Sequence, residues 1–491
     1  MRSFGMGKGG NKEMVIGKRT SEEGLFRMPG AWATLLLVLA DALVLEASLL
    51  LAYLVRQALG FFFPAKVPLE GLAPLALALL LFPLGYALAG LYPGYGLSAV
   101  ERMRRKVQVT FLLYLALIAW NWLFSQVDWS RSVLLMAMGF SLVLVPLGET
   151  LVRELLARLG LWGVPVLVLG AGKTGALVVR KLKEDGVLGL RPVALLDDDP
   201  AKWGVEVEGV RVVGSLEQAG AFARRGVRYA ILAMPGVGRE RLGKFLQTLP
   251  FPHVILVPDL FGLESLWVSS RDFGGMLGLQ IKRNLFLRRN QVLKRSLDII
   301  GGLLLFIPFT LLLPLISLAI YVEDRGPVFY RHLRIGQAGR RFYVLKFRTM
   351  RPDADRVLEE YLAANPEALR FWLEERKLKN DPRITHVGQF LRKSSLDELP
   401  QVINILLGDM SLVGPRPVTE EELAKYGQDA FYYLLVRPGL TGLWQVSGRN
   451  EVSYEKRVAL DRYYVQNWSI WLDLYILART VWVVLTHKGA Y

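Results

Sequence analysis

The sequence contains no cysteine in 491 residues. Without thiols the chain has no disulfide bonds, no thiolate nucleophile, no iron–sulfur cluster and no cysteine-type zinc site. Histidine is scarce as well, and its four residues lie far apart in the sequence, so a histidine-based metal site is not expected. Any metal ion bound by this protein should therefore be held by carboxylates.

Acidic residues are fewer than basic ones, with 44 Asp and Glu against 60 Lys and Arg, and the formal net charge is +16. Hydrophobic residues make up 52% of the chain, which excludes disorder over most of its length. A positive excess indicates an anionic partner. Because the basic residues lie beside long apolar runs, we expect that partner to be a membrane surface and not nucleic acid.

Four apolar, nearly uncharged runs follow a basic tail of residues 1–30. Each run approaches the roughly 20 residues that span a bilayer core, so they predict a bundle of four transmembrane helices within residues 31–150. The tail and the loop of residues 93–106 hold most of the basic residues, and the positive-inside bias places both in the cytoplasm, together with the chain after residue 150. The four runs cover residues 31–55, 72–92, 107–124 and 132–148.

Asp41 and Glu46 interrupt the first of these runs. Carboxylates inside a membrane are candidates for a functional role, because burying them there is costly. In a bundle of four helices they are equally well explained by hydrogen bonds between helices. The sequence leaves both interpretations open.

Residues 160–280 have the pattern of a nucleotide-binding α/β domain. An apolar strand, residues 164–169, leads into a turn of the form GxGxxG and then into a helical pattern, and a second strand ends at an aspartate. This arrangement predicts a Rossmann-like domain in which the turn and the aspartate would hold an NAD-type ligand. The alternative is that the glycines serve only the turn and the packing of the helix. The residues concerned are Gly170, Gly172, Gly175 and Asp197.

A membrane-bound NAD-dependent nucleotide-sugar dehydratase would combine membrane helices with such a domain. Enzymes of that class normally use a Tyr-x-x-x-Lys pair. The sole tyrosine between residues 160 and 290 is Tyr229, and Ala233 stands four positions later. The missing lysine argues against dehydratase chemistry.

A fifth apolar segment, residues 297–322, is long enough to cross a membrane. Basic residues flank it on both sides, so both of its ends are of the cytoplasmic type. Pro308 and Pro314 lie inside it, and each removes a helix hydrogen bond and favours a kink. We expect a broken, re-entrant helix that dips into one leaflet and returns, with an ordinary fifth span as the alternative.

The polar region after this segment is rich in arginine, glycine and proline, and it contains the pair Asp397 and Glu398. An arginine side chain grips phosphate oxygens with two N–H groups, so the region suits a polyanionic substrate. One carboxylate can attack a phosphoryl group while the other holds a divalent ion. Alternatively, Ser395 and Glu398 form a helix capping box, although Pro400 would then break a hydrogen bond of that helix.

From Lys294 to Tyr491 the chain resembles the catalytic domain of the monotopic polyprenyl-phosphate hexose-1-phosphate transferases, which are phosphoglycosyl transferases of the bacterial sugar transferase type. The C-terminal segments 444–450 and 489–491 are most similar to those of undecaprenyl-phosphate galactose phosphotransferases. The four spans and the Rossmann-like domain are similar to the N-terminal half of the large members. The helix-breaking proline of the family lies near position 311, where this chain has Pro308 and Pro314 instead.

The resemblance implies a monotopic α/β catalytic domain over residues 281–491, in which Asp397 is the nucleophile and Glu398 its metal-associated partner. Both carboxylates would lie at Mg²⁺ or Mn²⁺. The enzyme would take hexose-1-phosphate, and galactose-1-phosphate in particular, from a UDP-hexose, release UMP, and pass the phosphosugar from Asp397 to undecaprenyl phosphate. Further residues match the phosphate-contacting and nucleotide-contacting motifs of the family: Arg392, Arg416, Arg449, Lys346, Arg348 and Asp381.

The same resemblance implies the bacterial inner membrane as the location, with the catalytic domain on the cytoplasmic face. The reaction would be the first membrane step of polysaccharide, exopolysaccharide or lipopolysaccharide synthesis. A homodimer is left open. A non-enzymatic assembly scaffold with a decayed site is the rival interpretation, and the intact set of carboxylates and arginines argues against it.

Overall fold

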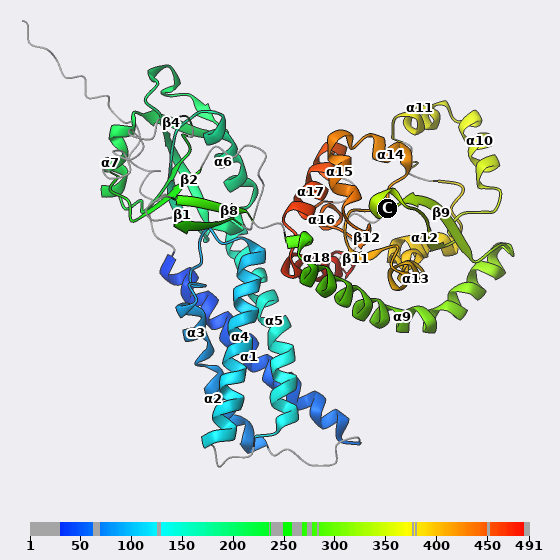
Figure 1. Ribbon diagram of the computed structural model, residues 1–491, viewed down its shortest axis with the longest axis horizontal. Helices are drawn as coiled ribbons and strands as arrows, with labels where there is room; N and C mark the ends of the chain where they lie inside the picture. Colours follow the sequence, from blue (N-terminus) through cyan, green and yellow to red (C-terminus); the bar gives the residue numbers. More distant parts are fainter. Residues whose placement is uncertain are drawn as a thin grey trace, which may run out of the picture. The chain divides into compact units, whose positions relative to one another are not determined.

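The computed structural model divides the chain into two compact units, Met1–Leu260 and Phe261–Tyr491, which are described separately below (Figure 1). The first unit holds a helical bundle and an α/β domain, and the second holds the region of the carboxylate pair. The structure describes residues 30–61, 69–124, 129–234, 236, 249–257, 268–272, 277–281, 284–375, 378, 381–448 and 452–485.

Three long apolar helices of the first unit are long enough to cross a membrane: α1 (Gly30–Ala58), α4 (Ala99–Phe124) and α5 (Arg131–Arg158). They pack around an apolar core that includes Leu45, Tyr114 and Val145. Leucines on their outer faces stay exposed, as expected of helices that face lipid. Among the described residues, the fourth helix with this length and composition is α9 (Arg288–Asp324) of the second unit.

The second expected span, residues 72–92, is wrong as a single helix. It consists of two short helices, α2 (Ala73–Leu79) and α3 (Phe82–Leu88), which together form a shorter apolar segment. Pro83 lies in the first turn of α3. A proline has no N–H, so Pro83 cannot donate the hydrogen bond to the Leu79 carbonyl that a single continuous helix would contain. The segment still packs into the bundle core through Leu75, Phe82 and Tyr86.

Asp41 belongs to a buried ionic network between α1, α4 and α5. Lys106 Nζ lies 2.5 Å from Asp41 and 3.1 Å from Glu149, and Arg153 Nε donates to Glu149 at 2.7 Å. All four side chains are buried. Tyr92 adds a hydrogen bond to Asp41. The geometry supports the structural interpretation of Asp41, because removing one member would leave an uncompensated charge in the bundle.

The α/β domain of the first unit is built on a six-stranded sheet with the strand order β3-β4-β2-β1-β5-β6. All neighbours are parallel except the short edge pair β3 and β4. Helix α6 (Lys173–Glu184) and helix α7 (Ala219–Arg224) lie over opposite faces, because Val168 packs with Val179 of α6 while Leu167 packs with Ala219 of α7. The expected Rossmann-like fold is therefore confirmed. The strands are β1 (Val164–Leu169), β2 (Leu190–Leu196), β3 (Glu206–Val207), β4 (Val210–Gly214), β5 (Tyr229–Leu232) and β6 (His253–Leu256).

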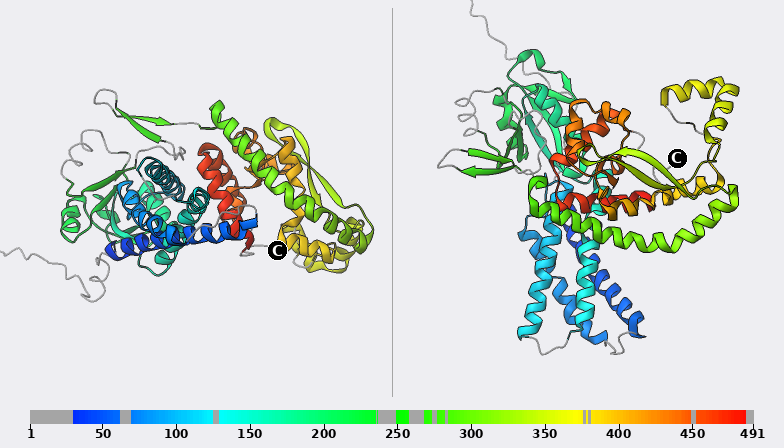
Figure 2. Two further views of the ribbon diagram at one scale, coloured as in Figure 1. Left: turned by 90° about the horizontal axis from the view of Figure 1, so that it is seen from below. Right: turned by 45° about the vertical axis from the view of Figure 1, so that its right-hand side comes forward.

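The second unit begins with a hairpin of β7 (Val268–Asp272) and β8 (Leu277–Ile281), followed by helix α9. Helix α9 is continuous over 37 residues although it contains Pro308 and Pro314, so the expected break is not found. It curves instead, with its concave side toward the rest of the unit (Figures 1 and 2). A proline can bend a helix without ending it when the helix segments on both sides of the proline stay packed against the rest of the protein.

One side of α9 packs against the rest of the second unit. Phe309, Ile316 and Ile320 are buried against Phe347, Leu391 and Val402, whereas the leucines on its other side are exposed. Near its start, Lys294 donates to Asp473 of α18 (Ile470–Leu485) at 2.9 Å, and Asp298 accepts from the Leu412 N–H of β11 (Ser411–Val413) at 3.0 Å. The two buried contacts tie the apolar helix to the polar part of the unit.

The polar part of the second unit surrounds two small sheets. The hairpin of β9 (Phe329–Ile335) and β10 (Arg341–Phe347) is antiparallel, and β11 pairs in parallel with β12 (Gly439–Thr441). The remaining helices of this part are α10 (Ala354–Ala364), α11 (Pro366–Glu375), α12 (His386–Ser394), α13 (Gln401–Leu407), α14 (Glu420–Ala424), α15 (Ala430–Leu434), α16 (Leu443–Val446) and α17 (Tyr454–Gln466).

Candidate active site

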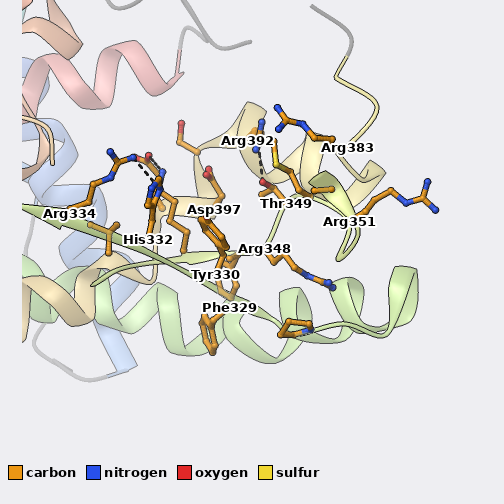
Figure 3. Close-up of a pocket in the computed structure, with 18 of the residues that line it drawn as sticks. Phe329, Tyr330, His332, Arg334, Arg348, Thr349, Arg351, Arg383, Arg392 and Asp397 are labelled. Atoms are coloured by element: carbon orange, nitrogen blue, oxygen red, sulfur yellow. Dashed lines mark hydrogen bonds and ion pairs between the residues drawn. The ribbon is translucent and has the colours of Figure 1, made fainter. Parts of the chain in front are cut away.

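A cavity of about 890 Å³ opens between the β9–β10 hairpin, α12 and the turn that follows α12. Asp397 and Glu398 line it, together with aromatic and cationic side chains from several separate parts of the sequence. Figure 3 shows Asp397 between two groups, with His332 and Arg334 on one side and Thr349, Arg383 and Arg392 on the other. The cations that line the cavity are Arg334, Lys346, Arg348, Arg351, Arg383, Arg392 and Arg416.

A sharp reversal of the chain presents the carboxylate pair. Helix α12 ends at Ser394, Ser395 has the left-handed backbone angle φ of 57°, and a short 3-10 turn, Leu396–Glu398, follows. The side chain of Ser395 makes no capping hydrogen bond to this turn. The alternative of a capping box is therefore wrong, and the strained serine instead directs the next residues toward the cavity.

Glu398 is held by Lys346 of β10, whose Nζ donates to Oε1 at 2.6 Å. The adjacent Asp397 is mostly buried from solvent, and this burial, together with the charge of Glu398, raises its pKa to about 6. Lys346 and Arg392 act in the opposite direction and lower that pKa. At neutral pH Asp397 is thus mainly ionised, yet more basic than an ordinary aspartate, which suits a carboxylate nucleophile.

Several predicted site residues do meet in this cavity. Lys346, Arg348, Arg392 and Arg416 line it, as do Asp397 and Glu398. Arg392 is positioned by Thr349, whose Oγ1 accepts from its Nε at 2.9 Å. Arg416 follows β11, where the close approach of Gly414 and Gly439 leaves no room for a Cβ: one added to Gly439 would lie 2.1 Å from the Gly414 nitrogen.

The side chains of two predicted site residues, Arg348 and Asp381, bind other residues around the cavity. The side chain of Arg348 runs away from Asp397 in Figure 3 and forms an ion pair with Asp324 at the end of α9. Asp381 is not among the residues that line the cavity; it binds Arg383, which is, through three hydrogen bonds of 2.6–3.1 Å. Burial opposes ionisation of Asp381, but the bonds from Arg383 outweigh it and lower the pKa of that carboxyl group. Arg449 lies outside the described residues.

Sequence reasoning missed the cavity residues of β9. Tyr330, His332 and Arg334 alternate along the strand and share the face that carries Lys346 on β10. Arg334 is held by Glu422 at 3.0 Å, and its Nη2 lies 3.3 Å from His332 Nδ1. Because arginine can only donate, Nδ1 accepts and a neutral His332 carries its proton on Nε2. The sequence shows that these three residues alternate, as on one face of a strand. It does not show that this face of β9 lines a cavity.

The carboxylate pair offers oxygen ligands of the type that a divalent ion takes. Within the described part of the chain, no three His, Asp or Glu side chains cluster as a complete metal site. Mg²⁺, however, is commonly held by one or two carboxylates, with substrate phosphates and water completing its coordination. Asp397 and Glu398 at the wall of an arginine-lined cavity provide such a partial set.

The glycine-rich turn of the first unit has the expected geometry around Gly170 and Gly175. A Cβ on Gly175 would lie 2.0 Å from the Gly170 oxygen, so this glycine permits close packing of helix and strand. Gly172 has open space instead. Asp197 accepts from the Ala171 N–H at 2.7 Å and from Lys202 at 3.0 Å, so it stabilises the turn itself. An NAD-type ligand here stays a prediction.

Comparison with known proteins assigns families to both halves of the chain. Residues 289–487 match the family described as bacterial sugar transferase. Residues 87–256, which include α4, α5 and the six-stranded sheet, match a family described as CoA-binding domain. The two matches divide the chain near the boundary of its two compact units.

The chain is also similar to individual proteins over most of its length. It is 39% identical to the UDP-galactose-lipid carrier transferase of Erwinia amylovora over 376 residues, which cover 75% of this chain and 78% of the relative. It is 39% identical to the undecaprenyl-phosphate galactose phosphotransferase of Salmonella typhimurium over 400 residues, with 80% and 82% covered. The exopolysaccharide production protein ExoY of Rhizobium meliloti is 53% identical over 198 residues, which cover 40% of this chain and 88% of the relative.

Proposed function

The chain belongs to the bacterial sugar transferase family and is a phosphoglycosyl transferase, and from this premise we propose that it transfers hexose-1-phosphate from a UDP-hexose to undecaprenyl phosphate. Galactose is the hexose that we propose, because relatives that match most of the chain are named for galactose. Similarity to ExoY supports a place in exopolysaccharide or related polysaccharide synthesis.

The proposed first step is an attack by Asp397 on the sugar-bearing phosphorus of the donor. A bond forms between a carboxylate oxygen of Asp397 and phosphorus, and the bond from phosphorus to the bridging oxygen breaks, so that UMP leaves. In the second step a phosphate oxygen of undecaprenyl phosphate attacks the same phosphorus. The carboxylate is released and a polyprenyl diphosphate sugar is formed. Each step exchanges one phosphorus–oxygen bond for another, as in other enzymes with a carboxylate nucleophile.

The cations of the cavity would bind the phosphate groups. Arg392, Arg383 and Arg351 lie on one side of Asp397 and Arg334 on the other (Figure 3). Negative charge on the oxygens of the reacting phosphate would therefore be stabilised by arginines on both sides. Glu398 and Asp397 would hold Mg²⁺, which when bound would reduce the repulsion between the nucleophile and the phosphate oxygens. Lys346 holds the Glu398 side chain in place through its ion pair.

Helix α9 would bring the lipid acceptor to the cavity. Its exposed leucines suit the acyl region, and its buried residues contact Phe347, which directly follows Lys346 in sequence. The basic residues at both flanks favour a re-entrant path with both ends on the cytoplasmic face of the inner membrane. A soluble donor and a lipid acceptor would thus meet at one membrane surface.

The observation that carries this proposal is the position of Asp397 in an arginine-lined cavity, beside a glutamate that a lysine holds. The test is a panel of UDP-sugars offered to the full-length protein with undecaprenyl phosphate and Mg²⁺, scored for UMP release and for the lipid product. Release of UMP from UDP-galactose, together with a lipid diphosphate sugar, is expected. Failure with every UDP-hexose would contradict the proposal.

A further inference from the structure

Two acidic residues end the apolar helix α9 at an unfavourable place for negative charge. No charged residue occurs between Asp298 and Glu323, and Asp324 is the last residue of the helix. The C-terminus of a helix carries a partial negative charge, so carboxylates are disfavoured in its last turn. Their presence there points to partners outside the helix.

Asp324 holds the guanidinium group of Arg348. The two side chains form an ion pair, and both are largely shielded from solvent. Among the described residues, Nε and Nη1 of Arg348 have no hydrogen-bond partner, so Asp324 is the group that fixes this side chain. Gly326 makes room for it, because a Cβ there would lie 1.9 Å from Nη1. The end of α9 is thereby fastened to the end of β10.

Glu323 holds the beginning of helix α12. Its Oε1 accepts from the His386 N–H at 2.7 Å and its Oε2 from the Val387 N–H at 3.1 Å. The first N–H groups of a helix have no partner within the helix, so an external carboxylate there fixes the helix start. Helix α12 in turn carries Arg392 and leads into the turn of Asp397.

Both connections meet at Thr349. It follows Arg348 directly, its Oγ1 accepts from Arg392 at 2.9 Å, and its carbonyl oxygen accepts from the Thr385 N–H at 3.2 Å. Gly388 of α12 lies so close that an added Cβ would be 2.1 Å from the same oxygen. A shift of either acidic residue would therefore be passed on to Arg392 through a tightly packed contact.

We propose that Glu323 and Asp324 are positioning residues, through which the lipid-facing helix α9 sets the place of Arg392 beside Asp397. This inference rests on the proposed function. Neither carboxylate acts on the substrate itself: Asp324 works through Arg348 and Thr349, and Glu323 works through α12. The remaining cavity cations are not held by these two residues, so donor binding should persist when the pair is disturbed.

The test compares Asp324→Asn, Asp324→Glu and Glu323→Ala with wild type, as full-length protein in lipid nanodiscs with a UDP-hexose and undecaprenyl phosphate. We expect kcat for UMP release to fall about tenfold in Asp324→Asn and Glu323→Ala, with KM for the donor changed less than about twofold, because misplacement acts on the transition state. Asp324→Glu should recover most of the rate. Asp429→Asn is the matched control, since it removes an ion pair with Arg462 away from the cavity.

A folded Asp324→Asn protein with wild-type kcat would overturn the inference, and so would a loss equal to that of Asp429→Asn or a change confined to KM. If Asp324→Asn does not fold, Glu323→Ala decides by the same criteria. If neither of these two variants folds, Glu323→Gln, which keeps the size of the side chain and removes its charge, decides by the same criteria. Wild-type protein that releases no UMP would contradict the proposed function instead.

Discussion

Lys346 Nζ lies 2.6 Å from Glu398 Oε1, so a strand residue and a turn residue 52 positions apart form an ion pair at the wall of the cavity. The pair leaves Asp397 next to a fixed negative charge that raises its pKa and near a fixed positive charge that lowers it. The reactivity of Asp397 therefore depends on both neighbours.

Asp397→Asn should abolish UMP release and formation of the covalent adduct. The amide is nearly the same size as the carboxylate but is not a nucleophile, so the fold should remain. Glu398→Gln leaves the nucleophile Asp397 unchanged. It should lower the rate of UMP release and weaken the dependence of that rate on Mg²⁺. The measurement is retention of labelled phosphosugar on the protein after denaturation. Labelled adduct on Asp397→Asn would show that another residue is the nucleophile.

The pH dependence of the reaction should reflect the ionisation of Asp397. A carboxylate nucleophile must be ionised, and with a pKa of about 6 the rate should fall as the pH is lowered through this range. Lys346→Met removes a charge that lowers the pKa of Asp397, so the acidic limb should move to higher pH relative to wild type. The measurement is kcat/KM for the donor between pH 5 and pH 9, taken with both proteins at the same Mg²⁺ concentration. A limb that moves to lower pH would contradict this electrostatic arrangement.

Asp461 should make the second unit less stable at neutral than at acidic pH. It is buried, it accepts a hydrogen bond from Tyr426 at 2.8 Å, and burial raises its pKa to about 7. A folded-state pKa above the unfolded value means that folding favours the protonated form. The penalty is absent below the unfolded pKa, grows as the pH rises toward about 7, and then stays, on the order of 4 kcal/mol.

Asp461→Asn is the variant that isolates this effect, because it cannot ionise. The difference in Tm between pH 5 and pH 8 should be smaller for the variant than for wild type. Equal differences would show that Asp461 is ionised in the folded protein at both pH values.

The parts of the molecule that depend on local patterns were predictable. Apolar length predicted α1, α4 and α5, and the glycine pattern predicted the β1–α6 turn. The break between α2 and α3 was not predicted, because hydropathy does not register where Pro83 removes a helix N–H.

In the site, motif resemblance pointed to Asp397, Glu398 and Arg348 as residues, but not to the turn that presents Asp397 or to the direction of the Arg348 side chain. That direction is set by Asp324, a residue of another element. Likewise, His332 could be placed at the cavity only once the register of β9 and β10 was known. Contacts between distant elements, and not local propensity, decide both positions.

The path of α9 through the membrane can be tested with single cysteines, because the chain contains none. Leu287→Cys precedes α9 and Glu421→Cys follows it, and both positions are exposed. If α9 is re-entrant, both cysteines should react with a membrane-impermeant maleimide from the cytoplasmic side. Gly60→Cys, between α1 and α2, should react from the opposite side and serves as the control. Labelling of Leu287→Cys and Glu421→Cys from opposite sides would make α9 a full span.

The glycine-rich turn of the first unit offers a matched pair of substitutions. Gly172 has φ of −86° and no atom within 4 Å of an added Cβ, so Gly172→Ala should leave stability nearly unchanged. Gly175→Ala would place a methyl group 2.0 Å from the Gly170 oxygen and should destabilise the first unit by about 1–3 kcal/mol. This corrects the simple expectation that every glycine of a GxGxxG turn is required for close packing.

The two alanine variants also test whether the first unit takes part in the chemistry. Every residue assigned to phosphotransfer belongs to the second unit, so UMP release at saturating donor and acceptor should be the same for both variants and wild type while the protein is folded. The measurement is thermal unfolding of each variant beside its kcat below the unfolding temperature. If Gly172→Ala keeps wild-type stability but loses kcat, the open space at Gly172 has a role in turnover, and the division of labour between the two units must be given up.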